Sequence, residues 1–219
     1  MDQAEQVLCV WREVVSRLRP WTGWADYAPD LWDTVQRGAM LEKRTPELEA
    51  NTDLLQLVVY GVVSFDDQHG ENRTLVYRRG KAGSEDRLHR KLSLGIGGHV
   101  NRDDMIHPAI MRWAIFREIK EELGVVPITI YEHGILFDAS KTGVDAVHLG
   151  LVFDVRVDES EMYRLESEAA CEPVGWLTED EIREMYFRDR DQFETWSQWV
   201  IRGSMMSSDE VLSSNKETA

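Results

Sequence analysis

Cysteines and long apolar runs are scarce in this sequence, and their scarcity excludes two classes of protein. Only Cys9 and Cys171 are cysteines among 219 residues, which is too few for a disulfide framework, and they lack the spacing of a zinc site. The longest apolar run, residues 54–65, is interrupted by Gln56 and is too short to span a bilayer. The first residues are acidic and lack the basic, then apolar pattern of a signal peptide. We therefore expect a cytoplasmic protein that does not associate with membranes.

Positive charge is also in short supply. The sequence has 25 lysine and arginine residues against 40 aspartate and glutamate residues, a net charge of −15. This balance disfavours binding to duplex nucleic acid or to an anionic membrane surface. With 42% hydrophobic and 30% charged residues, the composition is that of a globular protein long enough for one sizeable core. A small-molecule partner is expected, and a homodimer is left open.

One stretch reverses this acidic balance. Residues 73–91 contain seven lysine or arginine residues and only Glu85 and Asp86 as acids. Arginine forks suit phosphate oxygens, so this run is a candidate for binding a substrate phosphate. The alternative is a solvated loop, because glycine and serine in its middle indicate a turn. The candidate phosphate-binding residues are Arg78, Arg79 and Lys81.

Three glutamates are clustered on a predicted helix that ends at Gly124. At about 100° per residue, they fall within roughly a third of the helix circumference. Such clustering destabilises a helix by a few tenths of a kcal/mol. It therefore indicates either a solvated acidic face or a site for a hard divalent cation, which takes oxygen ligands. The three residues are Glu118, Glu121 and Glu122.

The stretch that contains these glutamates resembles the second half of the Nudix box. The sequence Arg-Glu-Ile-Lys-Glu-Glu-Leu-Gly-Val at residues 117–125 matches its pattern R-E-U-x-E-E-x-G-U, in which U is a bulky aliphatic residue. Upstream, Gly97 and Gly98 look like the Gly-Gly loop that opens the box. Residues 77–101 also resemble a subgroup of the family labelled predicted phosphoesterases.

The spacing between the two halves departs from the family pattern. Counted from Gly98, the box requires a glutamate at position 104 and its arginine at position 112. The chain has Asp104 there, and the Arg-Glu pair that fits comes five residues after Arg112. We interpret this as an insertion that lengthens the helix at its N-terminal end. Asp103 or Asp104 then replaces the missing glutamate, and by count we predict that Asp104 pairs with Arg117.

The resemblance implies an α/β fold, a Nudix-like α/β/α sandwich with a mixed sheet. It also implies hydrolysis of a diphosphate linkage in a nucleoside diphosphate joined to another moiety, with Mg²⁺ as the cofactor and Mn²⁺ as an alternative. The implied catalytic residues are Arg117, Glu118, Glu121 and Glu122. The implied metal ligands are the three glutamates and the Gly97 carbonyl, and the general base is left open.

Patterning along the chain predicts three regions. Residues 1–50 form an N-terminal helical extension that begins with a helix over residues 3–18 and is rich in tryptophan, which we expect to anchor the extension. Residues 51–203 form the Nudix-like catalytic domain, with a late helix capped by Thr178 and Glu181. Residues 204–219 are expected to be a disordered tail. Strands are predicted at residues 54–65, 74–78, 91–96, 128–137, 147–157 and 174–177.

Two other functions are compatible with the sequence. A non-catalytic Nudix-like module that binds a nucleotide and regulates another process would explain the altered first half of the box. An isomerase of isoprenoid diphosphates, which shares the fold, would need a cysteine near the active site. Neither Cys9 nor Cys171 lies near the box in sequence.

Overall fold

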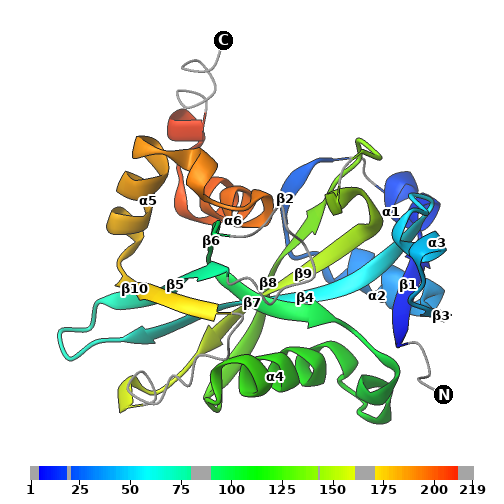
Figure 1. Ribbon diagram of the computed structural model, residues 1–219, viewed down its shortest axis with the longest axis horizontal. Coiled ribbons are helices and arrows are strands. Elements are labelled where there is room, and N and C mark those ends of the chain that lie inside the picture. Colours follow the sequence, from blue (N-terminus) through cyan, green and yellow to red (C-terminus); the bar gives the residue numbers. More distant parts are fainter. Residues whose placement is uncertain (1–4, 19–20, 80–89, 143, 161–170, 212–219) are drawn as a thin grey trace. The chain divides into compact units, whose positions relative to one another are not determined.

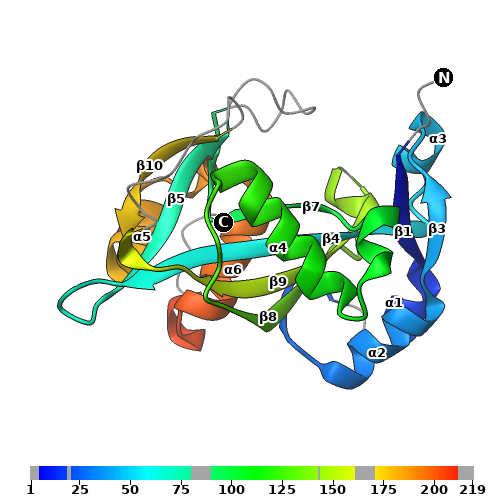
Figure 2. The ribbon, with the colours of Figure 1, turned by 90° about the horizontal axis from the view of Figure 1, so that it is seen from below.

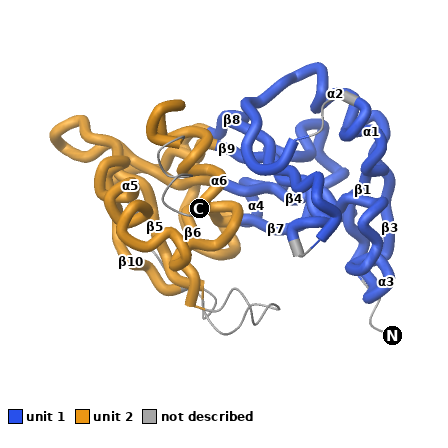
Figure 3. The backbone as a smooth tube through the Cα atoms, turned by 90° about the horizontal axis from the view of Figure 1, so that it is seen from above, with its two compact units in different colours: residues 1–61, 97–118, 130–153 blue, residues 62–96, 119–129, 154–219 orange. Residues whose placement is uncertain are grey.

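The computed structural model describes residues 5–18, 21–79, 90–142, 144–160 and 171–211, which form strands and helices in alternation (Figure 1). The chain divides into two compact units (Figure 3). Unit 1 comprises residues 1–61, 97–118 and 130–153. Unit 2 comprises residues 62–96, 119–129 and 154–219. Among the described residues, every helix is too short or too polar to cross a membrane.

The strands of unit 1 are joined mainly by antiparallel pairing. Strand β1 (Gln6–Trp11) pairs with both β3 (Met40–Lys43) and the start of β4 (Leu54–Asp66). Strand β2 (Gly23–Asp26) pairs with the end of β8 (Thr129–Phe137). In the sheet, β9 (His148–Arg156) lies between β4 and β8, and β2 follows β8.

The predicted helix over residues 3–18 is wrong in its first half. Residues 6–11 form β1, and helix α1 (Arg12–Leu18) begins only afterwards. Four consecutive residues of β1 are buried, and a short apolar run of this kind cannot be assigned to helix or strand by periodicity alone. Because β3 and β4 flank it on both edges, tertiary pairing decides the conformation. The extension also contains α2 (Pro29–Gly38) and α3 (Pro46–Glu49), so it is mixed rather than helical.

Tryptophans of the extension pack on β8, as predicted for an anchor. The Trp24 ring lies 4.9 Å from the His133 ring, and the Trp21 ring lies 5.1 Å from the Phe137 ring, between centroids. A Cβ on Gly134 would lie 2.2 Å from the Trp24 ring, so the indole occupies space that only glycine leaves open. These contacts fix residues 21–26 against β8 within unit 1.

Unit 2 is built around β5 (Asn72–Arg79), which pairs antiparallel with the end of β4, with β6 (Leu92–Ser93) and with β10 (Cys171–Leu177). The predicted strand over residues 91–96 is divided, because the Leu94 N–H donates to Ser197 Oγ (3.0 Å) rather than to a neighbouring strand. The chain resumes at β7 (Gly95–His99).

The helices of unit 2 follow β10. Helix α5 (Glu179–Arg188) begins with the predicted capping box between Thr178 and Glu181, and α6 (Thr195–Val200) continues into a wide turn, η6 (Ile201–Met205). The predicted disordered tail is wrong for residues 204–211, where Glu210 pairs with Arg183 of α5. Residues 212–219 lie outside the described residues.

Helix α4 (Ile110–Leu123) carries the glutamate cluster and is one continuous helix (Figure 2). Its residues Ile115, Ile119 and Leu123 are buried, as their spacing predicts. Gly124 follows in the left-handed conformation (φ 69°) and ends the helix. The alternation of helices with a mixed sheet confirms the predicted α/β class. The boundary predicted after residue 50 stays a prediction.

Candidate active site

The Gly-Gly loop and α4 meet in unit 1 at Gly98 and Glu118. A Cβ on Gly98 would lie 2.6 Å from Glu118 Oε1. A Cβ on Gly97 would lie 1.8 Å from the main-chain oxygen of Val59 on β4. Both distances are far below van der Waals contact, so a larger residue would displace the strand from β4 or from the carboxylate. The two glycines therefore allow β7 to approach both neighbours closely.

Arg117 forms a bidentate ion pair with Asp104, which follows this loop in the chain. Its Nε lies 2.8 Å from Asp104 Oδ1, and its Nη2 lies 2.9 Å from Asp104 Oδ2. The same nitrogen donates to the main-chain oxygen of His99 (3.3 Å), and Nη1 donates to Glu118 Oε1 (2.8 Å). The hydrogen bonds to Asp104 raise the pKa of Arg117 above its usual value, so the guanidinium stays charged.

Asp104 is placed by a short 3-10 helix, η2 (Arg102–Ile106), which lies between β7 and α4 in the chain. Asn101 caps this helix, and its main-chain N–H donates to Asp104 Oδ2 (2.9 Å). The Asp104 side chain is 0% exposed, whereas Asp103 is exposed. The predicted pairing of Asp104 with Arg117 is therefore present, and Asp103 does not take part in it.

Arg112, which stands where the unmodified box would have its arginine, has a different partner. Its Nε and Nη2 donate to the two carboxylate oxygens of Glu132 (2.8 and 2.6 Å). That pair is at the surface, with 49% of the Arg112 side chain exposed. Arg117, rather than Arg112, is thus the arginine that pairs with Asp104, and its role as the box arginine stays a prediction.

The three candidate metal ligands differ in their surroundings. Glu118 is 12% exposed and paired with Arg117, Glu122 is half-buried, and Glu121 is exposed. Among the described residues, no group of three or more acidic, histidine or cysteine side chains is drawn together as a metal site. The donor set still fits a hard cation, because the carboxylates lie at i, i+3 and i+4 of one helix. The metal and catalytic roles of these residues, and of the Gly97 carbonyl, stay predictions.

The candidate phosphate-binding residues belong to unit 2. Arg78 Nη1 donates to the main-chain oxygen of Arg90 (2.6 Å). Arg79 Nη1 donates to Glu194 Oε2 (3.0 Å), and 35% of the Arg79 side chain is exposed. Lys81 lies outside the described residues.

Sequence reasoning missed Glu194 as a neighbour of this group. It lies more than a hundred positions from Arg79 in the chain and just before α6, where no motif marks it. Its side chain is 5% exposed, and a buried carboxylate is rare unless it is paired. Burial raises the pKa of Tyr77, and Arg79, Glu194 and Glu122 all contribute to the electrostatic field at its hydroxyl. Within unit 2, the charges of these three residues therefore all act on one tyrosine.

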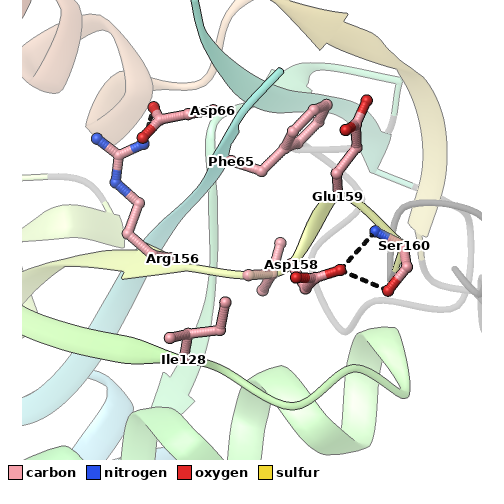
Figure 4. A pocket seen from close by; sticks show the side chains of 8 residues that line it. Phe65, Asp66, Ile128, Arg156, Asp158, Glu159 and Ser160 are labelled. Carbon is pink, nitrogen blue, oxygen red and sulfur yellow. Dashed lines mark hydrogen bonds and ion pairs between the residues drawn. The ribbon is translucent and has the colours of Figure 1, made fainter. Parts of the chain in front are cut away.

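A separate cavity of about 740 Å³ in unit 2 is not suited to a diphosphate (Figure 4). Three acids and one arginine line it, and Arg156 is already paired with Asp66 (2.7 Å). Asp158 accepts hydrogen bonds from the N–H (2.9 Å) and the hydroxyl (2.5 Å) of Ser160. Because its charge is negative on balance, this cavity would repel a phosphate group.

Cys9 is not placed for catalysis. It is buried in β1, and burial, followed by the charges of Glu42 and Glu49, raises the pKa of its thiol to about 12. A thiol that stays protonated at neutral pH is a poor nucleophile or acid-base group.

This architecture is similar to that of a solved structure. The chain superposes with a TM-score of 0.71 on Tm1382, a protein described as a candidate Nudix hydrolase, at 22% sequence identity. The match covers 90% of this chain and 96% of Tm1382. The chain has the Nudix fold. Its sequence is also 27% identical over 168 residues to protein YmaB of Bacillus subtilis, covering 74% of this chain and 77% of YmaB. No family model matches the sequence. The comparisons therefore establish the fold of the chain and not its activity.

Proposed function

We propose that this chain is a metal-dependent hydrolase that cleaves a diphosphate linkage in a nucleoside diphosphate joined to another moiety. The observation that carries the proposal is the Arg117 fork on buried Asp104, beside Glu118 packed against Gly98. A chain that had lost catalysis would have no need to build this arrangement around an altered spacing. The residues that orient a metal ligand are typically as constrained as the ligand itself.

The helix glutamates would hold the ion. Mg²⁺, or Mn²⁺, would be bound by Glu118, Glu121 and Glu122, with the Gly97 carbonyl as a further ligand, and it would neutralise phosphate charge and activate a water. Arg117 orients the Glu118 carboxylate through its Nη1. Gly98 leaves the loop backbone close enough to shield that carboxylate from bulk water.

Arg79 is our candidate for binding a substrate phosphate. It is about one-third exposed, and it belongs to the one basic stretch of an acidic protein. This combination of partial exposure and local positive charge supports a phosphate-binding role for Arg79.

The competing functions have lost part of their support. The non-catalytic module was favoured by the missing box glutamate, yet Asp104 supplies a partner for Arg117. The isomerase would need a reactive cysteine, and the Cys9 thiol is buried and protonated.

A hydrolysis screen tests the proposal directly. The full chain would be incubated with dinucleoside polyphosphates, nucleotide sugars, ADP-ribose and nucleoside triphosphates, with Mg²⁺, with Mn²⁺ and with a chelator. We expect release of a nucleoside phosphate from at least one class, abolished by the chelator. Absence of turnover on every class, with binding of a nucleotide retained, would instead support the regulatory module.

Replacing Arg79 by alanine is expected to raise the Michaelis constant and to flatten its dependence on salt. Attraction between exposed charges is screened over about 10 Å at 0.1 M salt, so removal of a phosphate-binding cation removes part of the salt effect. The measurement is KM at several salt concentrations. Arg156→Ala is the matched control, because Arg156 lines the acidic cavity. Equal effects in the two variants would instead support the alternative interpretation, in which residues 73–91 do not bind phosphate.

A further inference from the structure

Glu194 is a buried carboxylate that none of the roles assigned so far explains. It immediately precedes α6, its side chain is 5% exposed, and its main-chain N–H donates to the oxygen of Leu92 (3.0 Å). Burial of a charge costs several kcal/mol unless charged and polar partners compensate for it. Its partners therefore indicate why a glutamate is present at this position.

Both carboxylate oxygens of Glu194 accept hydrogen bonds within unit 2. Oε2 accepts from Arg79 Nη1 (3.0 Å), and Oε1 accepts from the hydroxyls of Ser93 and Ser197, the second at 3.3 Å. A carboxylate whose two oxygens are both engaged in this way is fixed in orientation. Such a group is suited to holding a cation in place, and less to accepting a proton during a reaction.

The same contacts lead to the first residue of β7. The Ser93 hydroxyl lies 3.1 Å from the main-chain oxygen of Gly95, and the Tyr77 hydroxyl donates to that oxygen (2.7 Å). Gly95 opens the strand on which Gly97 and Gly98 follow. Glu194 thus links the candidate phosphate-binding arginine to the beginning of the strand that forms the Gly-Gly loop.

The two ends of the ion pair differ sharply in exposure. The Arg79 side chain is 35% exposed, whereas that of Glu194 is 5% exposed. The guanidinium is therefore anchored from inside while it remains accessible to a solute. A surface ion pair made only for stability would contribute little, about 0–1 kcal/mol, and would not require a buried carboxylate.

We propose that Glu194 is a positioning residue that fixes the Arg79 guanidinium for binding a phosphate group of the substrate. The inference rests on the proposed function for its substrate class. It assigns a role to a residue outside the box and to the serines around it. Through Glu194, the loop before α6 takes part in substrate binding.

Glu194→Gln is expected to raise KM about tenfold while kcat changes less than twofold. The substitution keeps the size of the side chain and removes one charge-assisted hydrogen bond, and a tenfold change corresponds to about 1.4 kcal/mol. In an Arg79→Ala background, the same substitution should leave KM unchanged, because Glu194 acts through Arg79. A merely structural role would lower the melting temperature and add to the effect of Arg79→Ala. Glu184→Gln, at an exposed pair on α5, is the control.

A second variant keeps the test decisive if Glu194→Gln does not fold. Arg79→Lys retains the positive charge on a part-exposed side chain but loses the guanidinium fork. We expect KM to rise about tenfold while its salt dependence stays that of the wild type. A KM equal to that of the wild type would overturn the positioning role.

Calorimetry with inorganic pyrophosphate, in the presence of a chelator, separates this inference from the proposed function. If pyrophosphate binds and its affinity falls about tenfold in Glu194→Gln, the inference holds even when no substrate is hydrolysed. If hydrolysis is found but neither KM nor pyrophosphate affinity responds to Glu194→Gln, the inference fails and the proposed function stands.

Discussion

Changing Glu122 to glutamine is expected to lower turnover at least about 100-fold and to leave the protein folded. Loss of residues one step removed from a metal typically costs about 10–100-fold, so loss of a direct ligand should cost at least as much. Glu122 lies one turn after Glu118 on α4, and its neutralisation relieves like-charge repulsion of a few tenths of a kcal/mol. The free energy of unfolding should therefore stay within about 1 kcal/mol of the wild type.

The measurement combines kinetics with thermal unfolding. Turnover is compared at saturating Mg²⁺, and the rise in melting temperature on adding Mg²⁺ is compared between variants, since an ion that binds only the folded state stabilises it. Glu179→Gln, at an exposed position in the first turn of α5, is the matched control. Wild-type turnover and an undiminished metal-induced shift in Glu122→Gln would exclude Glu122 as a ligand.

The parts of the fold set by local pattern were predictable. Ile115, Ile119 and Leu123 recur at helical spacing and are buried on α4, and Gly124 ends the helix in the conformation that glycine adopts most readily. β4 was predictable for the same reason, because its β-branched and aromatic residues suit a buried strand. In each of these elements, side chains within a few positions of one another determine the structure.

The parts set by distant pairing were not predictable. Residues 6–11 fit a helical pattern with the residues that follow, and only their register with β3 and β4 makes them a strand. Glu194 contacts Arg79 and Ser93 from about a hundred positions away. No local signal distinguishes a glutamate that will be buried from one that will be solvated.

The Asp104–Arg117 pair lies between these cases. Only two acids, Asp103 and Asp104, stand between Gly98 and Glu118, so counting reduced the choice to two. The final choice depends on η2, whose capping by Asn101 turns Asp104 inward and leaves Asp103 exposed. That turn was not predicted, and it is what lets an aspartate, with a shorter side chain than the box glutamate, reach the arginine.

Asp104→Ala and Arg117→Ala are each expected to reduce turnover about 10–100-fold, and the double variant should lose little more. Each single change breaks the ion pair between Asp104 and Arg117, and with it the positioning of the arginine that orients Glu118. The second change therefore adds little to the loss. Each single variant should also lose about 3 kcal/mol of stability, because it leaves a buried charge without its partner. The double variant should be less destabilised than the sum of the two. Turnover is measured below the melting temperature of every variant, and stability is measured by urea unfolding. The two measurements give one double-mutant cycle for activity and one for stability.

Three further variants test whether the loss of turnover is specific to the Asp104–Arg117 pair. Asp104→Asn keeps an acceptor for the Asn101 N–H and removes the charge, so it should lose turnover while η2 remains capped. Asp103→Ala changes an exposed neighbour, and Arg112→Ala breaks a similar fork at the surface of the same helix. Both should keep turnover near that of the wild type, with stability losses of about 1 kcal/mol or less. Strictly additive losses of turnover in the Asp104 and Arg117 cycle would mean that the pair only stabilises the fold, and that Glu118 is oriented by other residues.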